Sequence, residues 1–422
     1  MTAAPPASPT STDTANANTT VTTGPGRLAG TRTGRGPRRR LAASLMALSL
    51  ASVPLLAAPA MAQPTGPDGS VDSAGSAGSA GSSGSAGSAG SSAIGVGPEG
   101  IGQAPVDSPV VPAPAGTIRA DFGAPGPHAI TVTKEARACD DLIHDLYADI
   151  VEATMNVHER PSCYDTFPGG TDSPIGVQFY YPTGVAEGTV ASAPLMILSP
   201  GVGANAGMID RQARLYASHG YVVAMGYTLV NWFGYQVELA AKSAIDHSLD
   251  PASPLHGKID FSRTMLVGQS AGGGSVARMG GLLDGALNGY RDVDFRTAGF
   301  VAIMPGPADF GTISPPSSVP ALFTIAEHES LVPWPLSRPA YDRHQGPAWW
   351  TVVKGTSHGS YLDDPKYTAY GALVLSFSTH VMGGGAPGTD GAPAAPDASA
   401  VYVGEGYRLA SDPELMMTER KG

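Results

Sequence analysis

The sequence has only two cysteines among its 422 residues, and its ten histidines include no His-x-His pair. Structural zinc sites use closely spaced cysteines and histidines, so we expect no metal, and no organic cofactor is implied. Basic residues are also in deficit, since 25 Lys and Arg against 36 Asp and Glu give a formal net charge of −11. An acidic chain without a basic stripe binds nucleic acid poorly, so we expect no nucleic-acid partner.

Long hydrophobic runs are rare, and the clearest one lies near the start of the chain. Residues 41–60 carry no charge, follow the arginine-rich stretch 35–40 and end in a small-x-small triplet at 60–62. This order is typical of a secretory signal. We therefore expect residues 1–62 to be a signal peptide with a long N-terminal region. The mature protein would be secreted or periplasmic, without a stable membrane anchor. A membrane-spanning anchor is the alternative, because the run is about long enough to cross a bilayer.

The next stretch has little that could form a core. Residues 63–127 are rich in Ser, Ala and Gly and then in Pro, which predicts a flexible linker. Residues 384–422 begin with a similar composition and show weak periodicity, so we expect a flexible C-terminal tail. Residues 128–383 remain as a single domain, the predicted catalytic domain, which is long enough to bury a substantial core.

The two cysteines, Cys139 and Cys163, suggest a disulfide in an exported protein. Such a bridge would stabilise the fold by about 3 kcal/mol on the loop-entropy model. Two separate buried thiols are the alternative. An amphipathic helix is predicted directly after Cys139, and the bridge would pin it to the loop before the first core strand. The apolar residues of this helix are Leu142, Ile143, Leu146, Ile150 and Val151.

From residue 175 onward, short apolar runs alternate with segments of helical periodicity. Alternating strands and helices predict an α/β fold with a mostly parallel central sheet and helices on both faces. The predicted strands are 175–181, 194–199, 221–225, 263–267, 298–304, 321–325 and 350–353, and the predicted helices are 206–219, 236–246, 270–283 and 365–382.

The stretch Gly268-Gln269-Ser270-Ala271-Gly272-Gly273 follows one of these strands and opens a helix. Glycines on both sides of a serine permit a sharp strand-to-helix turn that exposes the hydroxyl above a helix N-terminus. Backbone N–H groups there favour a developing negative charge. We therefore predict that Ser270 is a nucleophile.

A serine nucleophile needs a base and a carboxylate that orients the base. His358 follows the last predicted strand in a glycine-containing loop and is the predicted base, with His328 and His380 as alternatives. Glu329 is the predicted acid, and Glu327 is the competing carboxylate. The order serine, acid, histidine is the one that α/β-hydrolases use.

An oxyanion hole needs two backbone N–H donors. Ala271, the residue after the nucleophile, is one predicted donor. Val202, in the loop 200–204 that follows the strand 194–199, is the other. An ordinary glycine-rich turn is the alternative interpretation of that loop.

These motifs resemble, in order and spacing, those of the bacterial cutinase-like polyester hydrolases and of the related dienelactone-hydrolase and chlorophyllase-like α/β-hydrolases. The resemblance covers residues 175–382 and implies an α/β-hydrolase fold. It also implies a triad at Ser270, Glu329 and His358, with oxyanion donors at Val202 and Ala271. The matching segments are 179–183, 199–203, 268–273, 326–333 and 355–358.

The chain departs from polyester hydrolases at four positions. Those enzymes usually carry an aromatic residue where Val202 stands, a methionine where Ala271 stands and a tryptophan where Gly306 stands. Their acid is usually aspartate. We therefore expect an exported serine esterase that cleaves carboxylic esters through an acyl-enzyme. A polyester, cutin or lipid hydrolase acting on insoluble substrate is one alternative, and a non-catalytic binding module with the same fold is another. The partner would be a small-molecule or polymeric ester.

Overall fold

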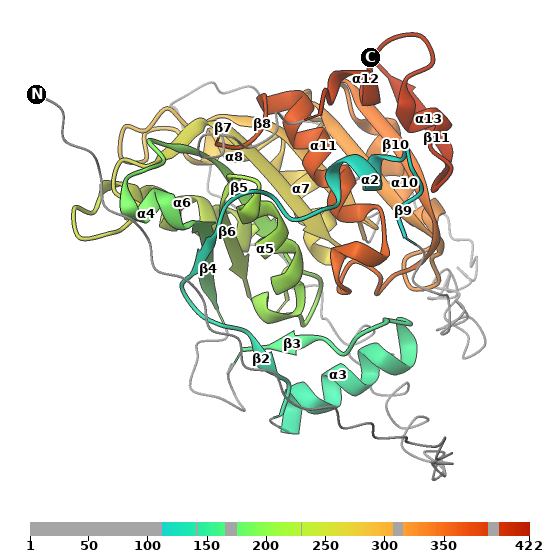
Figure 1. The fold of residues 1–422 in the computed structure, drawn as a ribbon, viewed down its shortest axis with the longest axis horizontal. Coiled ribbons are helices and arrows are strands. Elements are labelled where there is room, and N and C mark those ends of the chain that lie inside the picture. The colour runs from blue at the N-terminus through green and yellow to red at the C-terminus, as the bar shows by residue number, and fades with distance from the viewer. Residues whose placement is uncertain (1–111, 141, 165–174, 229, 307–314, 387–395) are drawn as a thin grey trace, which may run out of the picture.

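The computed structural model describes residues 112–140, 142–164, 175–228, 230–306, 315–386 and 396–422. The predicted signal peptide (1–62) and most of the predicted linker lie outside these residues. Within them, nine strands form one sheet in the order β1-β4-β6-β5-β7-β8-β9-β10-β11 (Figure 1). The strands are β1 (Ile130–Val132), β4 (Gly176–Pro182), β5 (Ala193–Ser199), β6 (Val222–Tyr227), β7 (Ile259–Gln269), β8 (Thr297–Ile303), β9 (Ala321–His328), β10 (Ala348–Ser357) and β11 (Leu415–Lys421).

The six central strands, from β6 to β10 in that order, run parallel, while β1, β4 and β11 pair antiparallel at the two edges. Helices pack on both faces of this sheet, and α3 (Leu142–Thr154) lies apart from both faces (Figure 1). The other helices are α2 (Ile118–Phe122), α4 (Thr183–Glu187), α5 (Asp210–Ser218), α6 (Tyr235–Leu249), α7 (Ala271–Met279), α8 (Leu283–Ala286), α10 (Trp334–Arg343), α11 (Tyr370–Met382), α12 (Ser399–Tyr402) and α13 (Arg408–Ser411). The predicted α/β class, with a mostly parallel sheet flanked by helices, is confirmed.

The strand β5 shows why the sheet lies in the centre. All of its residues are buried. Met196 and Leu198 belong to the apolar cluster that also contains α5 and α11, whereas Leu195 and Ile197 belong to the cluster with α6 and α7. Successive side chains of a strand point to opposite faces, so a continuous apolar run suits a strand covered on both sides. None of the helices in the described part of the chain is both long and apolar enough to cross a bilayer.

Both ends of the described chain differ from the sequence-based expectation. Part of the predicted linker folds, since Ile118 in α2 is fully buried and its backbone N–H donates to Asp412 Oδ2 at 2.7 Å. The predicted flexible tail is also wrong for residues 396–422, which carry α12, α13 and the edge strand β11. The two ends contact each other, since Arg119 and Glu414 form an ion pair at 2.6 Å with the guanidinium almost fully buried.

Residues 137–164, hereafter the disulfide segment, form a unit beside the carboxyl ends of the parallel strands (Figure 1). The short strands β2 (Arg137–Ala138) and β3 (Ser162–Cys163) pair antiparallel, and helix α3 lies between them in the sequence. The predicted disulfide between Cys139 and Cys163 is present, and both cysteines are buried. This bond ties the two ends of the segment together.

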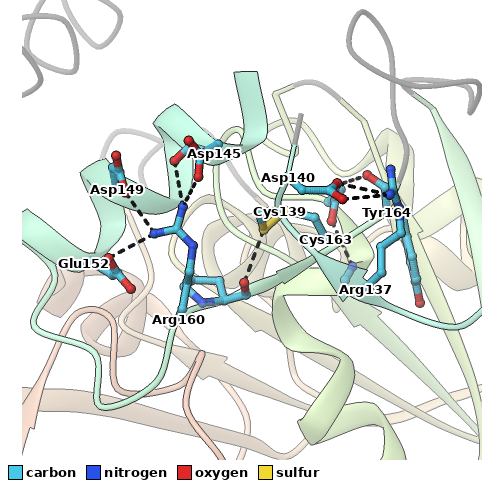
Figure 2. The surroundings of a disulfide bond; sticks show 12 residues. Arg137, Cys139, Asp140, Asp145, Asp149, Glu152, Arg160, Cys163 and Tyr164 are labelled. Atoms are coloured by element: carbon cyan, nitrogen blue, oxygen red, sulfur yellow. Dashed lines mark hydrogen bonds and ion pairs between the residues drawn. A yellow bond between two sulfur atoms is a disulfide. The ribbon is translucent and has the colours of Figure 1, made fainter. Parts of the chain in front are cut away.

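The helix predicted after Cys139 is confirmed as α3, but only part of its apolar stripe is covered. Val151 is fully buried and Ile150 is 7% exposed, whereas Leu142 at the first turn is 86% exposed. The opposite, acidic face is partly neutralised by Arg160, whose single guanidinium lies 2.6–3.0 Å from three carboxylates of α3 (Figure 2). These carboxylates belong to Asp145, Asp149 and Glu152. The ion pairs hold the returning chain against the helix.

Candidate active site

The turn between β7 and α7 holds Ser270 in a strained conformation. Its φ of 57° and ψ of −123° lie in a backbone region that residues other than glycine rarely adopt. Hydrogen bonds fix this backbone on both sides. The N–H of Ser270 donates to Ile303 O at 2.9 Å, and its carbonyl oxygen accepts from the N–H groups of Gly274 and Gly306 at 3.0 and 3.2 Å. The turn is therefore locked to the end of β8 and to the first turn of α7.

Two glycines of this turn stand where no side chain fits. A Cβ atom at Gly268 would lie 2.2 Å from Gly272 O, and one at Gly272 would lie 2.2 Å from Ser199 O. Both obstacles are backbone atoms, which cannot rotate away. The helix α7 can thus start directly beneath the end of β5, and the turn stays sharp.

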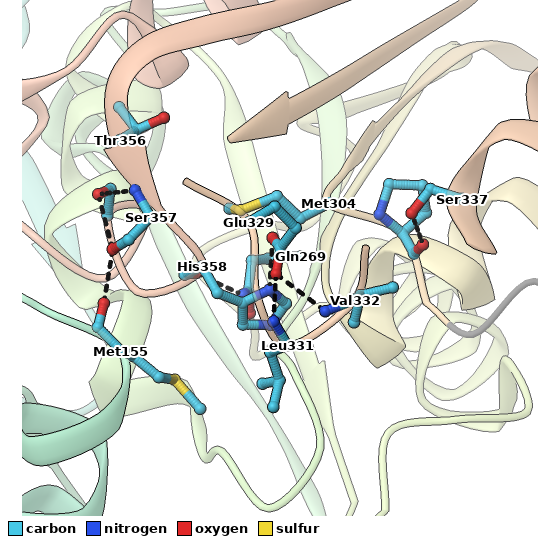
Figure 3. A network of polar contacts seen from close by, with 12 residues as sticks. Met155, Gln269, Met304, Glu329, Leu331, Val332, Ser337, Thr356, Ser357 and His358 are labelled. Atoms are coloured by element: carbon cyan, nitrogen blue, oxygen red, sulfur yellow. Dashed lines mark hydrogen bonds and ion pairs between the residues drawn. The ribbon is translucent and has the colours of Figure 1, made fainter. Parts of the chain in front are cut away.

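His358 and Glu329 meet at the carboxyl edge of the sheet. Glu329 follows the last residue of β9, and His358 follows the last residue of β10. His358 donates its Nδ1–H to Glu329 Oε2 at 2.8 Å, and both side chains are only 3% exposed (Figure 3). An ionised carboxylate only accepts, so this contact places the ring proton on Nδ1 and leaves Nε2 as an acceptor.

The carboxylate of Glu329 is itself oriented by the backbone. Its Oε1 accepts the N–H groups of Leu331 and Val332, each at 2.9 Å (Figure 3). With Oε1 engaged in the turn, Oε2 is directed to the imidazole. The acid, its turn and the base therefore form one rigid unit.

The loop that carries His358 also contacts the Ser270 turn. Gln269, the residue before Ser270, donates its Nε2–H to the carbonyl oxygen of His358 at 3.2 Å. Ser270 is 7% exposed and His358 is 3% exposed. The structure thus brings the loop of the predicted base against the turn of the predicted serine, although no hydrogen bond joins the Ser270 hydroxyl to His358 among the interactions of the described residues.

The loop after β5 lies against the same serine. A Cβ atom at Gly201 would be 3.2 Å from Ser270 Cβ, which places the Gly201–Val202 peptide beside the nucleophile. Ala271 is the first residue of α7 and is buried. Its N–H belongs to the first four of a helix, which have no partner inside the helix. Both predicted oxyanion donors are therefore close to Ser270 in the chain or in space.

The competing residues have other contacts. Glu327 accepts the N–H of Gly355 at 2.8 Å and so stabilises the loop after β10. His328 is exposed and lies 3.9 Å from Glu327. His380, inside α11, packs against the rings of Trp349 and Tyr402. None of the three is in contact with Glu329 or Ser270 in the interactions of the described residues.

Sequence reasoning missed Asn231, which is fully buried in the loop after β6. Its Nδ2 donates to the carbonyl oxygens of Gly201 and Ala204, both at 2.8 Å, and its Oδ1 accepts the N–H of Thr228 at 2.6 Å. Its φ of 50° is of the kind that asparagine tolerates better than most residues. That residue preference was the only local signal in the sequence.

The described residues contain no group of three or more His, Cys, Asp or Glu side chains placed to hold a metal ion. No protein-family model matches the chain, and no curated protein matches it. The geometry of the site is therefore the basis for any functional assignment.

Proposed function

We propose that this chain is a serine hydrolase with an α/β-hydrolase fold that cleaves carboxylic esters. The observation that carries the proposal is the 2.8 Å contact between His358 and Glu329, in a loop that contacts the turn where Ser270 is held at positive φ between a strand and a helix. A buried carboxylate, an oriented imidazole and a serine on a sharp strand-to-helix turn are the three groups that acyl transfer requires.

In this mechanism Ser270 Oγ attacks the ester carbonyl carbon while His358 Nε2 takes the hydroxyl proton. The carbonyl oxygen becomes an oxyanion that accepts hydrogen bonds from the N–H groups of Val202 and Ala271. The C–O bond to the alcohol breaks, and His358 returns the proton to the leaving alkoxide. Water then attacks the acyl-enzyme with His358 as base, and the acid is released as Ser270 recovers its proton. Glu329 stabilises the imidazolium that forms in each half-reaction.

A soluble or small ester suits the site better than an insoluble polyester. Where the resembling polyester hydrolases carry a tryptophan, this chain has Gly306, and a Cβ atom there would lie only 2.7 Å from Val332 Cγ1. Val332 is part of the turn that orients Glu329. An aromatic side chain at this position would therefore have to displace the Val332 side chain, and the absence of such a clamp favours a substrate that does not need one.

We also propose that the enzyme acts outside the cytoplasm. The predicted signal peptide and the buried disulfide between Cys139 and Cys163 support this location, because disulfides persist mainly in oxidising compartments.

The test is hydrolysis of p-nitrophenyl esters, from acetate to long acyl chains, by the purified protein and by Ser270→Ala. We expect turnover in the unmodified protein and a loss of at least about 10⁴-fold in kcat in the variant. A fluorophosphonate probe should label Ser270 and no other residue. Absence of turnover together with absence of labelling would favour a binding module, and turnover of polyester film in preference to soluble ester would favour the polyester alternative.

A further inference from the structure

Val202 lies between two peptide groups that are each fixed by a distant side chain. Asn231 fixes the first, by donating to the carbonyl oxygen of Gly201 at 2.8 Å. A peptide group is planar, and its C=O and N–H point in opposite directions. Because the Val202 nitrogen belongs to the same peptide as that carbonyl, this hydrogen bond also sets the direction of the Val202 N–H.

Tyr147 fixes the second peptide. Its hydroxyl donates to the carbonyl oxygen of Val202 at 2.7 Å. Its ring packs on the next residue, because a Cβ atom at Gly203 would lie 3.1 Å from the ring carbon Cε2. Gly203 also has a φ of +71°, a conformation that residues with a side chain rarely adopt. This turn therefore favours glycine for two reasons, the backbone conformation and the close approach of the Tyr147 ring. Burial raises the pKa of the Tyr147 hydroxyl above its usual value, so the group remains a proton donor at neutral and mildly alkaline pH.

Tyr147 belongs to α3 of the disulfide segment, and the same segment also holds the loop of the base. The carbonyl oxygen of Met155, directly after α3, accepts the hydroxyl of Ser357 at 2.6 Å and the N–H of Gly359 at 3.2 Å (Figure 3). Ser357 and Gly359 are the two neighbours of His358. A Cβ atom at Gly359 would lie 2.5 Å from Met155 O, so the two backbones touch.

The two contacts come from the same short stretch of chain. Tyr147 lies within α3 and Met155 directly follows its last residue, so the two positions are about 12 Å apart along the helix axis. At its base the segment is closed by the disulfide and by Arg160 on the acidic face of α3 (Figure 2). One rigid element therefore bridges the oxyanion loop and the base loop.

We propose that the disulfide segment helps to form the active site and that Tyr147 is a positioning residue. Its hydroxyl holds the Val202 carbonyl group, and this restrains the neighbouring Val202 N–H that would bind the oxyanion. The inference rests on the proposed ester hydrolysis. Tyr147 does not contact the substrate in this scheme. Its hydroxyl restricts the rotation of the peptide next to the oxyanion donor, so its loss lowers transition-state stabilisation more than substrate binding.

The test compares Tyr147→Phe with Tyr402→Phe. Both substitutions remove one hydroxyl that donates to a backbone carbonyl, but Tyr402 donates to Leu373 O in α11 and touches neither site loop. For p-nitrophenyl acetate, we expect kcat of Tyr147→Phe to fall about 10-fold, with KM within about 2-fold of the unmodified protein. Inhibition by phenylboronic acid should weaken by the same factor, because its tetrahedral adduct places an oxygen at the oxyanion position. Tyr402→Phe should lose thermal stability but keep its kcat.

A second variant keeps the inference testable if Tyr147→Phe does not fold. Ser357→Ala removes the hydroxyl that contacts Met155, and we expect kcat to fall about 3-fold with KM unchanged. If folded Tyr147→Phe and Ser357→Ala both keep the kcat and the boronate affinity of the unmodified protein, the inference is overturned while the proposed function stands. If the unmodified protein hydrolyses no ester and binds no boronate, both proposals fail together.

Discussion

His358 Nδ1 lies 2.8 Å from Glu329 Oε2, and the other oxygen of that carboxylate is held by two backbone N–H groups. This division of roles fixes which oxygen faces the imidazole. It also fixes how a glutamine would sit in the same place, because only a carbonyl oxygen can accept the two backbone N–H groups.

Glu329→Gln is therefore expected to reverse the tautomer of the base. The amide oxygen would keep the contacts with Leu331 and Val332, and the amide NH₂ would face His358 Nδ1. An NH₂ group donates, so Nδ1 would have to accept and the ring proton would move to Nε2. His358 could then no longer take the proton of Ser270. We expect kcat for p-nitrophenyl acetate at pH 7.5 to fall roughly 10³-fold, with little change in KM.

The matched control for this variant is Glu327→Gln. Glu327 stands two residues earlier and accepts the N–H of Gly355 at 2.8 Å, a contact that an amide oxygen can also make. We expect its kcat to stay within about 3-fold of the unmodified protein. Equal losses in the two variants, or none in Glu329→Gln, would show that Glu329 does not orient the base.

The second prediction concerns the turn itself. In Gly272→Ala the new Cβ would lie 2.2 Å from Ser199 O and 2.5 Å from Pro200 O, so β5 or α7 must move. We expect a loss of roughly 3 kcal/mol in the free energy of unfolding in urea, together with loss of turnover. Gly285→Ala in α8 is the control, because nothing lies within 4 Å of the added atom. That variant should be as stable as the unmodified protein or up to about 1 kcal/mol more stable. Similar stability of both variants would mean that the turn is not close-packed.

Much of the sheet could be predicted from the sequence, because its buried strands are apolar on both faces. The run 194–199 predicted β5 to within one residue, and the run 321–325 predicted most of β9. The strand β11 was missed because it is an edge strand with only Leu415 buried, so its apolar signal is weak. The helix α2 was missed for a different reason. It has five residues, and its N–H bond to Asp412 joins positions 294 residues apart.

Some residues of the candidate site could also be predicted from the sequence, and others could not. Ser270, Glu329 and His358 each follow a recognisable strand, and parallel strands bring their carboxyl ends to one edge, so their proximity follows from the topology. Tyr147 and Asn231 are not at strand ends. Tyr147 reaches Val202 across 55 positions through a helix that the core sheet does not require, and Asn231 acts through a buried loop. No local pattern encodes such contacts.

The third prediction is a pH dependence of stability that originates at Asp363, in the loop after β10. This carboxyl is fully buried. Its Oδ1 accepts the N–H groups of His158 and Glu159 at 2.7 and 3.0 Å, so it ties the disulfide segment to the loop of the base. Its Oδ2 has no hydrogen-bond partner among the described residues. Burial raises the pKa of Asp363 to about 7, although the two N–H groups and the charge of Arg211 oppose the shift.

The sign of the effect follows from proton binding. In the unfolded chain this aspartate has a pKa of about 3.9, so between about pH 4 and pH 7 the folded state holds a proton that the unfolded state has lost. The free energy of unfolding must therefore fall as pH rises through that window, by an amount on the order of 4 kcal/mol from this group. Below about pH 4 both states are protonated, and above about pH 7 both are ionised, so the contribution levels off on either side.

Asp363→Asn removes the titrating group and keeps an oxygen for the two N–H groups. We expect its stability relative to the unmodified protein to rise from pH 4.5 to about pH 7 and then to level off towards pH 8, as measured by urea unfolding at constant ionic strength. Asp364→Asn changes the neighbouring, more exposed carboxylate, which pairs with Lys366 at 2.9 Å, and should retain the change of stability with pH that the unmodified protein shows. If the difference between Asp363→Asn and the unmodified protein were the same at every pH, the buried carboxyl would not be protonated in the folded state. The two N–H groups of the disulfide segment would then donate to an ionised carboxylate throughout this pH range.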